Sequence, residues 1–247
     1  MEIIFALDIK NEKVVHGIQG KRYWYAPPKN KLFDPPIPEN IVNTVIKKYG
    51  INKFYIADLN SIMKNGNNFF ILDSLIQKFK FSDFYIDAGI YNQDYISDYL
   101  KKGYSKVIIG LETLKNIGIL KDLYKQYGDK ILFSLDLYNG IPVTSDRNLL
   151  NKQASEIIKL VKNYGAKEII FLDINSVGAM LGHNSVYTSL VETWGSEIDI
   201  FVAGGIKSIE NISEFKKLGV KGVILASLIY GNLINYDDIR GLSGSRT

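Results

Sequence analysis

One phrase recurs along this sequence: a helical pattern that ends in glycine, followed at once by an apolar run. It occurs as IKKYG before INKFYIAD, YLKKG before YSKVIIG, YKQYG before DKILFSLD, KNYG before AKEIIFLD and KKLG before VKGVILA. Lysine in the last turn complements the helix dipole, and glycine takes the left-handed position that ends a helix. Strands that alternate with helices and read as near-continuous apolar runs predict a parallel sheet that is buried on both faces.

Eight such apolar runs can be counted, at about 2–8, 53–58, 83–87, 106–110, 130–136, 167–173, 199–203 and 222–226. Eight βα units in a chain of 247 residues are typical of a (β/α)8 barrel. We therefore expect an α/β fold, a TIM barrel, in which residues 1–240 form a single domain. Residues 241–247, GLSGSRT, are expected to be a flexible tail or an added sequence.

The chain also repeats itself. Four blocks recur in the same order: ALDIKN and SLDLYN, ADLNSI and LDINSV, YIDAGI and FVAGGI, KKGYSKVIIG and KKLGVKGVILA. The members of three pairs lie 115 or 116 residues apart, and those of the first pair lie 128 apart. Matching polar residues behind matching strands predict two duplicated (βα)4 halves. The larger first offset places an insertion within 14–40, which we expect to contact substrate, although a plain surface loop would give the same offset.

Composition narrows the class of protein. The formal net charge is only +4, and there is no cysteine. The lysines are spread over helical segments, which is typical of a solvated surface, so we expect no nucleic-acid partner. No apolar run approaches 18 residues, so we expect no membrane span and a cytoplasmic protein. Monomer and homodimer both remain open.

Carboxylates end several of the predicted strands. Asp8 and Asp136 end the first and fifth strands, which lie opposite each other in an eight-stranded barrel. Partial burial raises the pKa of such groups into a useful range, and one can accept a proton while the other donates one. We predict that Asp8 and Asp136 are catalytic. Asp58 and Asp173 are weaker candidates, and all of these acids could instead hold loops or pair with lysines.

Glycines after the strands indicate anion sites. Exposed backbone N–H groups at such turns suit a phosphate, and the loops after the last two barrel strands are a common position for one. The internal repeat predicts a second, related site in the first half, hence a small phosphorylated sugar that could carry two phosphates. The residues expected to bind substrate or phosphate are Gly20, Arg22, Gly89, Gly110, Asp173, Gly178, Gly204, Gly205, Ala226 and Ser227.

Metal chemistry has little support in the sequence. His16 and His183 are the only histidines and are far apart, without the spacing of metal ligands. We expect each to be structural or to hydrogen-bond a substrate, and we expect no metal site.

Taken together, these motifs resemble the histidine-biosynthesis (β/α)8 barrels over about residues 2–235. The resemblance rests on ALDIKNEKVV, ADLNS, DAGI, VIIGLETL, SLDLYNG, LDINSVGAMLGHN, AGGIKS and GVILASLIY. It is nearest to the phosphoribosylformimino aminoimidazole carboxamide ribotide isomerase, and it implies an Amadori rearrangement of an aminoaldose phosphate without metal or cofactor. In that pattern Asp8 matches the base and Asp136 matches the strand-5 aspartate.

Three departures qualify this expectation. The isomerases carry an acid where this chain has Val177, Val-Arg-Leu where it has Val15-His16-Gly17, and glycine where it has Ala226. The resemblance therefore implies either that Asp136 is the acid or that the substrate differs, as in a pterin or other cofactor pathway. Two further functions stay open. One is a cyclase or lyase of the imidazole glycerol phosphate synthase type, which needs an ammonia-supplying partner, and the second is a non-catalytic phosphosugar binder.

Overall fold

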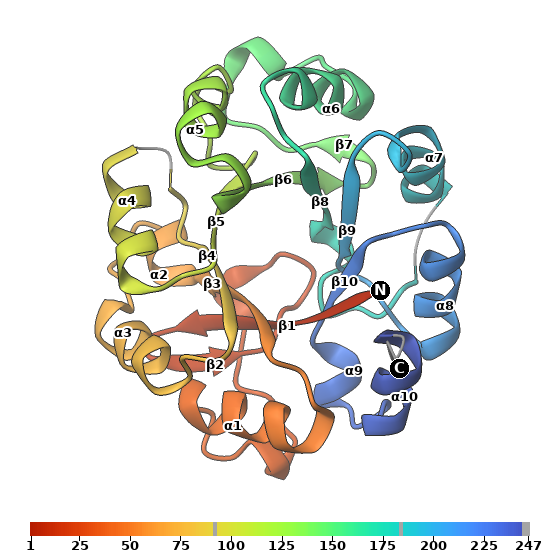
Figure 1. The fold of residues 1–247 in the computed structure, drawn as a ribbon. Coiled ribbons are helices and arrows are strands. Elements are labelled where there is room, and N and C mark those ends of the chain that lie inside the picture. The colour runs from red at the N-terminus through yellow and green to blue at the C-terminus, as the bar shows by residue number, and fades with distance from the viewer. Residues whose placement is uncertain (91–92, 183–184, 244–247) are drawn as a thin grey trace.

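The computed structural model describes residues 1–90, 93–182 and 185–243, and the expected α/β TIM barrel is confirmed (Figure 1). Parallel pairing follows the order β10–β9–β8–β6–β5–β4–β3–β1, and the pairing of β10 with β1 closes the barrel. The barrel strands are β1 (Glu2–Lys10), β3 (Lys53–Asp58), β4 (Asp83–Asp87), β5 (Lys106–Gly110), β6 (Ile131–Tyr138), β8 (Glu168–Asp173), β9 (Asp199–Ala203) and β10 (Gly222–Leu225).

Helices lie between the strands and surround the barrel (Figure 1). They are α1 (Pro38–Tyr49), α2 (Leu59–Ile62), α3 (Phe69–Lys78), α4 (Gln93–Lys102), α5 (Ile119–Tyr127), α6 (Ala154–Asn163), α7 (Ser185–Trp194), α8 (Ile209–Lys217), α9 (Ser227–Tyr230) and α10 (Tyr236–Ser243). Gly50 ends α1 with a φ of 68°, as the recurring helix–glycine–strand phrase predicts. No helix among the described ranges is long and apolar enough to cross a membrane.

The last helix changes the expected boundary of the tail. Helix α10 continues to Ser243, three residues past the expected boundary at 240, and buries Leu242 in the core. Residues 241–243 therefore belong to the folded barrel, because burying the apolar side chain of Leu242 stabilises the last turn of the helix.

Two short hairpins extend the barrel strands at matching places in the two halves. Strand β2 (Lys13–Val15) pairs antiparallel with β1, and β7 (Ile141–Pro142) pairs antiparallel with β6. The first turn has left-handed Asn11 and Glu12, and the second has left-handed Asn139 and Gly140. Positive φ at both central residues is the geometry of a tight hairpin turn. The repeated ALDIKN and SLDLYN thus fold alike, and β1 and β6 each run two residues further than predicted.

Two apolar layers hold the barrel together. Side chains that alternate along the strands point inward and fill its centre, including Ile4, Tyr55, Ile108, Leu132 and Phe201. The intervening side chains point outward and form a larger layer beneath the helices. This alternation is why the strands read as continuous apolar runs in the sequence.

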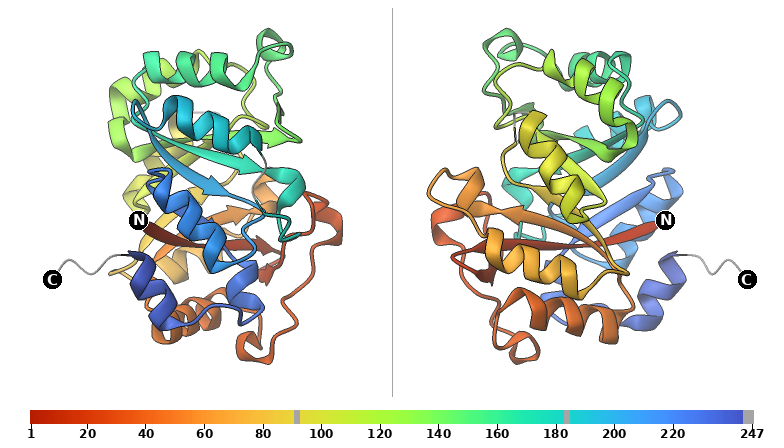
Figure 2. Two further views of the ribbon diagram at one scale, coloured as in Figure 1. Left: turned by 90° about the vertical axis from the view of Figure 1, so that its right-hand side faces the viewer. Right: turned by 60° about the vertical axis from the view of Figure 1, so that its left-hand side comes forward.

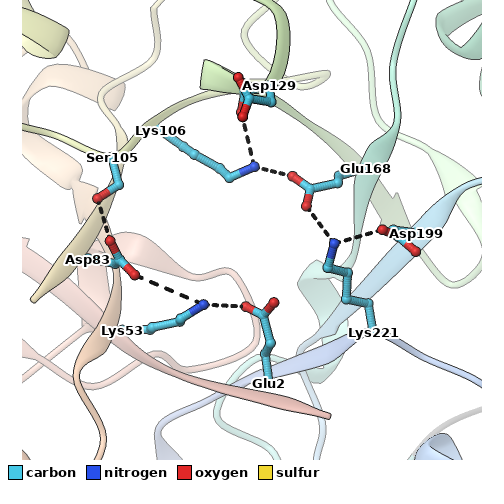
Figure 3. A network of polar contacts seen from close by, with 9 residues as sticks. All are labelled: Glu2, Lys53, Asp83, Ser105, Lys106, Asp129, Glu168, Asp199 and Lys221. Carbon is cyan, nitrogen blue, oxygen red and sulfur yellow. Dashed lines mark hydrogen bonds and ion pairs between the residues drawn. The ribbon is translucent and has the colours of Figure 1, made fainter.

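Ion pairs surround the end of the barrel at which the strands begin. Glu168, at the start of β8, accepts hydrogen bonds from Lys106 and Lys221, and Lys221 also pairs with Asp199 (Figure 3). A second group, which contains Glu2, Lys53, Asp83 and Ser105, lies beside it. In barrels of this class, this end stabilises the fold and the opposite end carries the site.

The insertion predicted within 14–40 lies at that opposite end. In Figure 2 the N-terminus marks one end of the barrel, and the segment after β2 projects from the other. Main-chain hydrogen bonds hold this segment, for example from His16 N–H to the Ala26 carbonyl oxygen at 2.8 Å. Lys10 Nζ also donates to the Arg22 carbonyl oxygen at 3.0 Å. The insertion is therefore fastened to the strand on which Asp8 lies.

Candidate active site

Asp8 and Asp136 lie on opposite sides of the barrel, near the C-terminal ends of β1 and β6. The closed strand order places β1 and β6 four strands apart in either direction. Both side chains line a single hollow, which we call the barrel mouth. Because active sites of (β/α)8 barrels are built at this end, the barrel mouth is the candidate active site.

Asp136 is buried, and protein groups hold both of its carboxylate oxygens. Ser134 Oγ donates to Oδ1 at 2.7 Å, and the Glu112 backbone N–H donates to Oδ2 at 2.9 Å. Burial raises the pKa of Asp136 to about 7, although both hydrogen bonds oppose the rise. A carboxyl group with this pKa is protonated in a large fraction of molecules at neutral pH, so it can act as a general acid.

Asp8 is half-buried, and its carboxylate accepts no hydrogen bond within the described part of the chain. Burial raises the pKa of Asp8 to about 7, with Arg22 lowering it and Asp87 raising it further. Because no donor in the described ranges holds its oxygens, the ionised form can take a proton from a bound molecule.

Asp87, at the end of β4, adds a third carboxylate to the barrel mouth. Tyr55 donates its hydroxyl hydrogen to Oδ2 at 3.0 Å, and the Gly89 backbone N–H donates to Oδ1 at 3.1 Å. Burial raises the pKa of Asp87, against the effect of these hydrogen bonds. Asp87 is therefore held in place by the protein on both oxygens, unlike Asp8.

An ion pair joins the insertion to the segment after β5. Arg22 Nη1 and Nη2 donate to Glu112 Oε1 and Oε2 at 2.9 and 2.5 Å. This two-bond arrangement is the strong form of an arginine–carboxylate contact. Arg22 lines the barrel mouth as predicted, but Glu112 occupies both of its terminal nitrogens.

Glycine backbone forms part of the wall contributed by β9 and β10. Gly204 and Gly205 have φ values of 87° and 74°. A Cβ on Gly204 would lie 2.4 Å from the Asp173 carbonyl oxygen, and one on Gly205 would lie 2.7 Å from Ser176 Cβ, so only glycine fits. Main chain free of side chains therefore borders the mouth here, as a phosphate site requires.

A hydroxyl and an imidazole lie beside these glycines. Ser227 Oγ is 2.9 Å from His16 Nε2, and both residues line the barrel mouth. Burial lowers the pKa of His16, so its ring is neutral at pH 7. His16 was expected to be structural or to hydrogen-bond substrate, and this position suits either role. His183 lies outside the described residues.

Comparison with known proteins identifies relatives of this barrel. Residues 2–235 match the family model described as "Histidine biosynthesis protein". The chain belongs to this family. An uncharacterized protein of Methanocaldococcus jannaschii is 32% identical over 242 residues, which are 97% of each chain.

Isomerases are also among the relatives. The 1-(5-phosphoribosyl)-5-((5-phosphoribosylamino)methylideneamino) imidazole-4-carboxamide isomerase of Methanococcus maripaludis is 34% identical, over 96% of this chain and 98% of the relative. The enzyme of the same name from Bacillus cytotoxicus is 26% identical over 97% of each chain. The predicted resemblance to the histidine-biosynthesis family is confirmed over nearly the whole barrel.

Two of the departures from the family pattern fit each other in space. Val177 stands where the resemblance implies an acid, and a Cβ on Gly17 would lie 2.4 Å from Val177 Cγ1. A Cβ on Gly178 would lie 1.7 Å from the Gly17 carbonyl oxygen, and Gln19 N–H donates to the Val177 carbonyl oxygen at 2.7 Å. Gly17 therefore leaves the space that Val177 fills, and the two loops contact each other at the barrel mouth.

The structure brings most of the predicted site residues together. The barrel mouth is lined by Asp8, Gly20, Arg22, Asp136, Gly178, Gly204, Gly205, Ala226 and Ser227. Gly89 and Gly110 do not line it. Gly89 lines a separate hollow with Ser61 and Lys64, and Gly110 lies beside Asp136, whose Oδ2 is 3.1 Å from the place of a Cβ on Gly110. The two glycines predicted to form one anion site are thus not brought together at the mouth.

Asp173 also lies outside the barrel mouth, because its carboxylate points back into the turn that follows its strand. Its Oδ2 accepts a hydrogen bond from Ser176 Oγ at 2.7 Å, and Asp58 Oδ2 accepts one from Ser61 Oγ at 2.8 Å. The repeated Asp-x-Asn-Ser is thus one kind of turn built twice. The structure gives Asp173 this local contact in place of the expected substrate contact.

Besides His16, four polar residues that line the barrel mouth were outside the predicted set: Tyr25, Tyr55, Asp87 and Glu112. Alternation along β3 places Tyr55 on the same inward face as Ala57, a signal the sequence contains. Asp87 could have been found as Asp8 and Asp136 were, because it is a carboxylate at the end of a predicted strand, 83–87. Glu112 follows the predicted strand 106–110 by two residues, which places it at the mouth, but the sequence gives no sign of its ion pair with Arg22.

Proposed function

We propose that this protein is an acid/base aldose–ketose isomerase that converts a phosphoribosyl aminoaldose to the corresponding aminoketose. The observation that carries the proposal is the pair Asp8 and Asp136, which lie on opposite strands of one hollow and have pKa values raised by burial to about 7. The relatives named as isomerases act, by their names, on a phosphoribosylamino compound. We assign the reaction class of these relatives to this barrel.

In this mechanism Asp136 is the acid and Asp8 is the base. Asp136 protonates the ring oxygen of the sugar, so that the ring opens to an imine. Asp8 then removes the proton from C2, and the resulting enaminol takes a proton at C1 to give the aminoketose. Near pH 7 one of two such carboxyl groups can be protonated while the other is ionised, which is the state that this reaction needs.

The phosphate of the substrate would lie against Gly204, Gly205 and Ser227. The Gly205 amide donates no hydrogen bond among the residues that the structure describes, so it is available to a ligand. Ser227 Oγ offers a hydroxyl on the same wall, supported by His16. Backbone amides and a hydroxyl suit the oxygens of a phosphate, and they orient the sugar between the two aspartates.

The test is turnover by the full chain in deuterium oxide, followed by proton NMR. The candidate substrates are the aminoaldose named for the relatives and simpler N-substituted 5-phosphoribosylamines. We expect deuterium at C1 of the ketose product, and a kcat lowered about 10²- to 10⁴-fold in Asp8→Asn and in Asp136→Asn. Asp122→Asn, an exposed substitution on α5, is the control and keeps full activity. Full turnover in either active-site variant would overturn the mechanism.

The same assay distinguishes an isomerase from a binding protein and from a cyclase. A non-catalytic binder would retain phosphosugars without product, and a cyclase or lyase would form product only with ammonia. Rescue of a histidine auxotroph that lacks the isomerase would assign the histidine-pathway substrate. Turnover of another aminoaldose phosphate without rescue would assign the enzyme to a different pathway.

A further inference from the structure

The two halves of the barrel differ at the positions that would form matching anion sites. A shift of 116 residues relates Ala203 to Asp87 and Ser227 to Leu111. Ala203 and Ser227 line the barrel mouth on the side assigned to phosphate. In the first half, a carboxylate replaces the methyl group and a fully buried leucine replaces the hydroxyl. The duplication has therefore kept the fold of this site in the first half but not its anion-binding groups.

Main-chain amides of the first half are already engaged by carboxylates of the protein. The Gly89 N–H donates to Asp87 Oδ1 at 3.1 Å, and the Glu112 N–H donates to Asp136 Oδ2 at 2.9 Å. In the second half, the amide of Gly205, which matches Gly89, has no partner within the described ranges. A phosphate bound in the first half would have to displace two carboxylates of the protein from the amides it needs.

The charges that line the barrel mouth also disfavour a second phosphate. The barrel mouth is lined by the carboxylates of Asp8, Asp87, Glu112 and Asp136, and Arg22 is the one arginine or lysine among the described residues that line it. Glu112 already binds both terminal nitrogens of that guanidinium. A second phosphate would therefore meet like charges at short range in a partly buried site. The free lone pairs of these carboxylates accept hydrogen bonds instead.

We infer that the substrate is a monophosphate: its phosphate lies at Gly205 and Ser227, and its other end carries a hydrogen-bond-donating, uncharged or cationic group that faces Asp87 and Glu112. This inference rests on the proposed function, and it separates the substrate from a sugar with a phosphate at each end. The chain has thus become asymmetric in ligand binding while remaining symmetric in fold.

Binding of three pentulose phosphates to the full chain, measured by titration calorimetry, tests the inference. The ligands are 1-amino-1-deoxyribulose 5-phosphate, ribulose 5-phosphate and ribulose 1,5-bisphosphate, which differ only at C1. We expect the amine to bind most tightly and the bisphosphate at least about 10-fold more weakly than the amine. Tightest binding by the bisphosphate, or no binding of any of the three, would overturn the inference.

Single substitutions test which residues bind each end of the ligand. Ser227→Asp places a carboxylate at the phosphate end and should weaken all three ligands at least 10-fold. Asp87→Asn should reduce the preference for the amine over the bisphosphate about 3- to 10-fold. Retained binding of ribulose 5-phosphate shows that this variant is folded. Asp122→Asn should preserve the order of the three. An unchanged preference in Asp87→Asn contradicts the assignment of that end.

The neighbouring hollow that contains Gly89 provides a further control. If the bisphosphate bound most tightly and Lys64→Ala removed that advantage, the second phosphate would lie in this hollow and the inference would be wrong. These binding results are independent of turnover. A reversed binding order together with turnover that depends on Asp8 would overturn this inference alone and leave the proposed function intact.

Discussion

Val177 Cγ1 lies only 2.4 Å from the position that a Cβ on Gly17 would occupy, so the side chain of one residue fills the space left by the other. The backbone of Gly17 is not left-handed, so space and not conformation requires glycine there. We predict that Gly17→Ala lowers the free energy of unfolding by about 1–3 kcal/mol, the usual cost of overpacking. Chemical denaturation measures this loss.

Val177→Ala is the matched partner of that substitution, because it removes the atom that collides. The double variant should recover most of the loss, giving an interaction energy of about 1 kcal/mol or more in a double-mutant cycle. Simple additivity of the two single variants would show that the loops separate easily and that the fit is unimportant.

The pH dependence of activity should report Asp8 and Asp136 together. Because burial raises the pKa of each to about 7, we predict a bell-shaped profile of kcat/KM centred near pH 7. The rising limb reflects ionisation of the base, and the falling limb reflects loss of the proton from the acid. The residual activity of Asp136→Asn should lack the falling limb. A flat profile from pH 5 to 9 would contradict the assignment.

Asp8 should also make the protein less stable as the pH rises. Its pKa is about 7 in the folded state against an ordinary value of 3.8, so the folded state binds the proton more tightly and stability falls between about pH 4 and pH 7. Asp8→Asn removes this penalty. Its stability relative to the native protein should grow by about 2 kcal/mol between pH 5 and pH 8, measured by thermal or chemical unfolding. The exposed Asp237→Asn should show no such change.

The matched aspartates should differ in their effect on stability. Asp58 is fully buried and accepts hydrogen bonds from two groups each of Ser61 and Asn68, whereas Asp173 accepts one from Ser176. We predict that Asp58→Asn lowers the free energy of unfolding by about 3 kcal/mol and Asp173→Asn by less than about 1 kcal/mol. Equal losses would show that the two turns contribute alike.

Glu168 should be important for stability at the other end of the barrel. Burial by itself raises its pKa, but the hydrogen bonds from Lys106 and Lys221 outweigh this and hold the pKa below its usual value. We predict that Glu168→Gln lowers the free energy of unfolding by about 2 kcal/mol at pH 7. The loss should shrink as the pH falls below about 4, because protonation then removes the same charge from the native protein. Activity at low temperature should be unchanged, since this end is remote from the mouth.

The sequence predicts the barrel well because its signals are local. The helix–glycine–strand phrase and the apolar runs indicate eight strands within two residues of their observed ends. The two tight hairpins were missed because their returning strands, at 13–15 and 141–142, are too short to stand out in the sequence. In the second hairpin the Asn-Gly turn, with left-handed Asn139 and Gly140, was the available signal.

The candidate site was predicted only in part. Asp8 and Asp136 end recognisable strands, so their placement follows from the strand count and the closure of the barrel. Asp87 ends β4 and Glu112 follows β5, so both lie at the mouth, but their hydrogen bonds with Tyr55 and Arg22 join segments that are far apart in the sequence. Such contacts form only when the barrel closes, and no periodicity records them.

The sequence by itself determined the barrel, its duplication and its opposed aspartates, because strand periodicity, helix ends and repeats are written in neighbouring residues. The tertiary structure alone decided which backbone amides of the two halves are engaged by the protein itself. The Gly89 and Glu112 amides are taken by Asp87 and Asp136, whereas the matching Gly205 amide has no partner in the described part of the chain. Whether a backbone donor is free depends on what folds against it, and that is a property of the closed barrel.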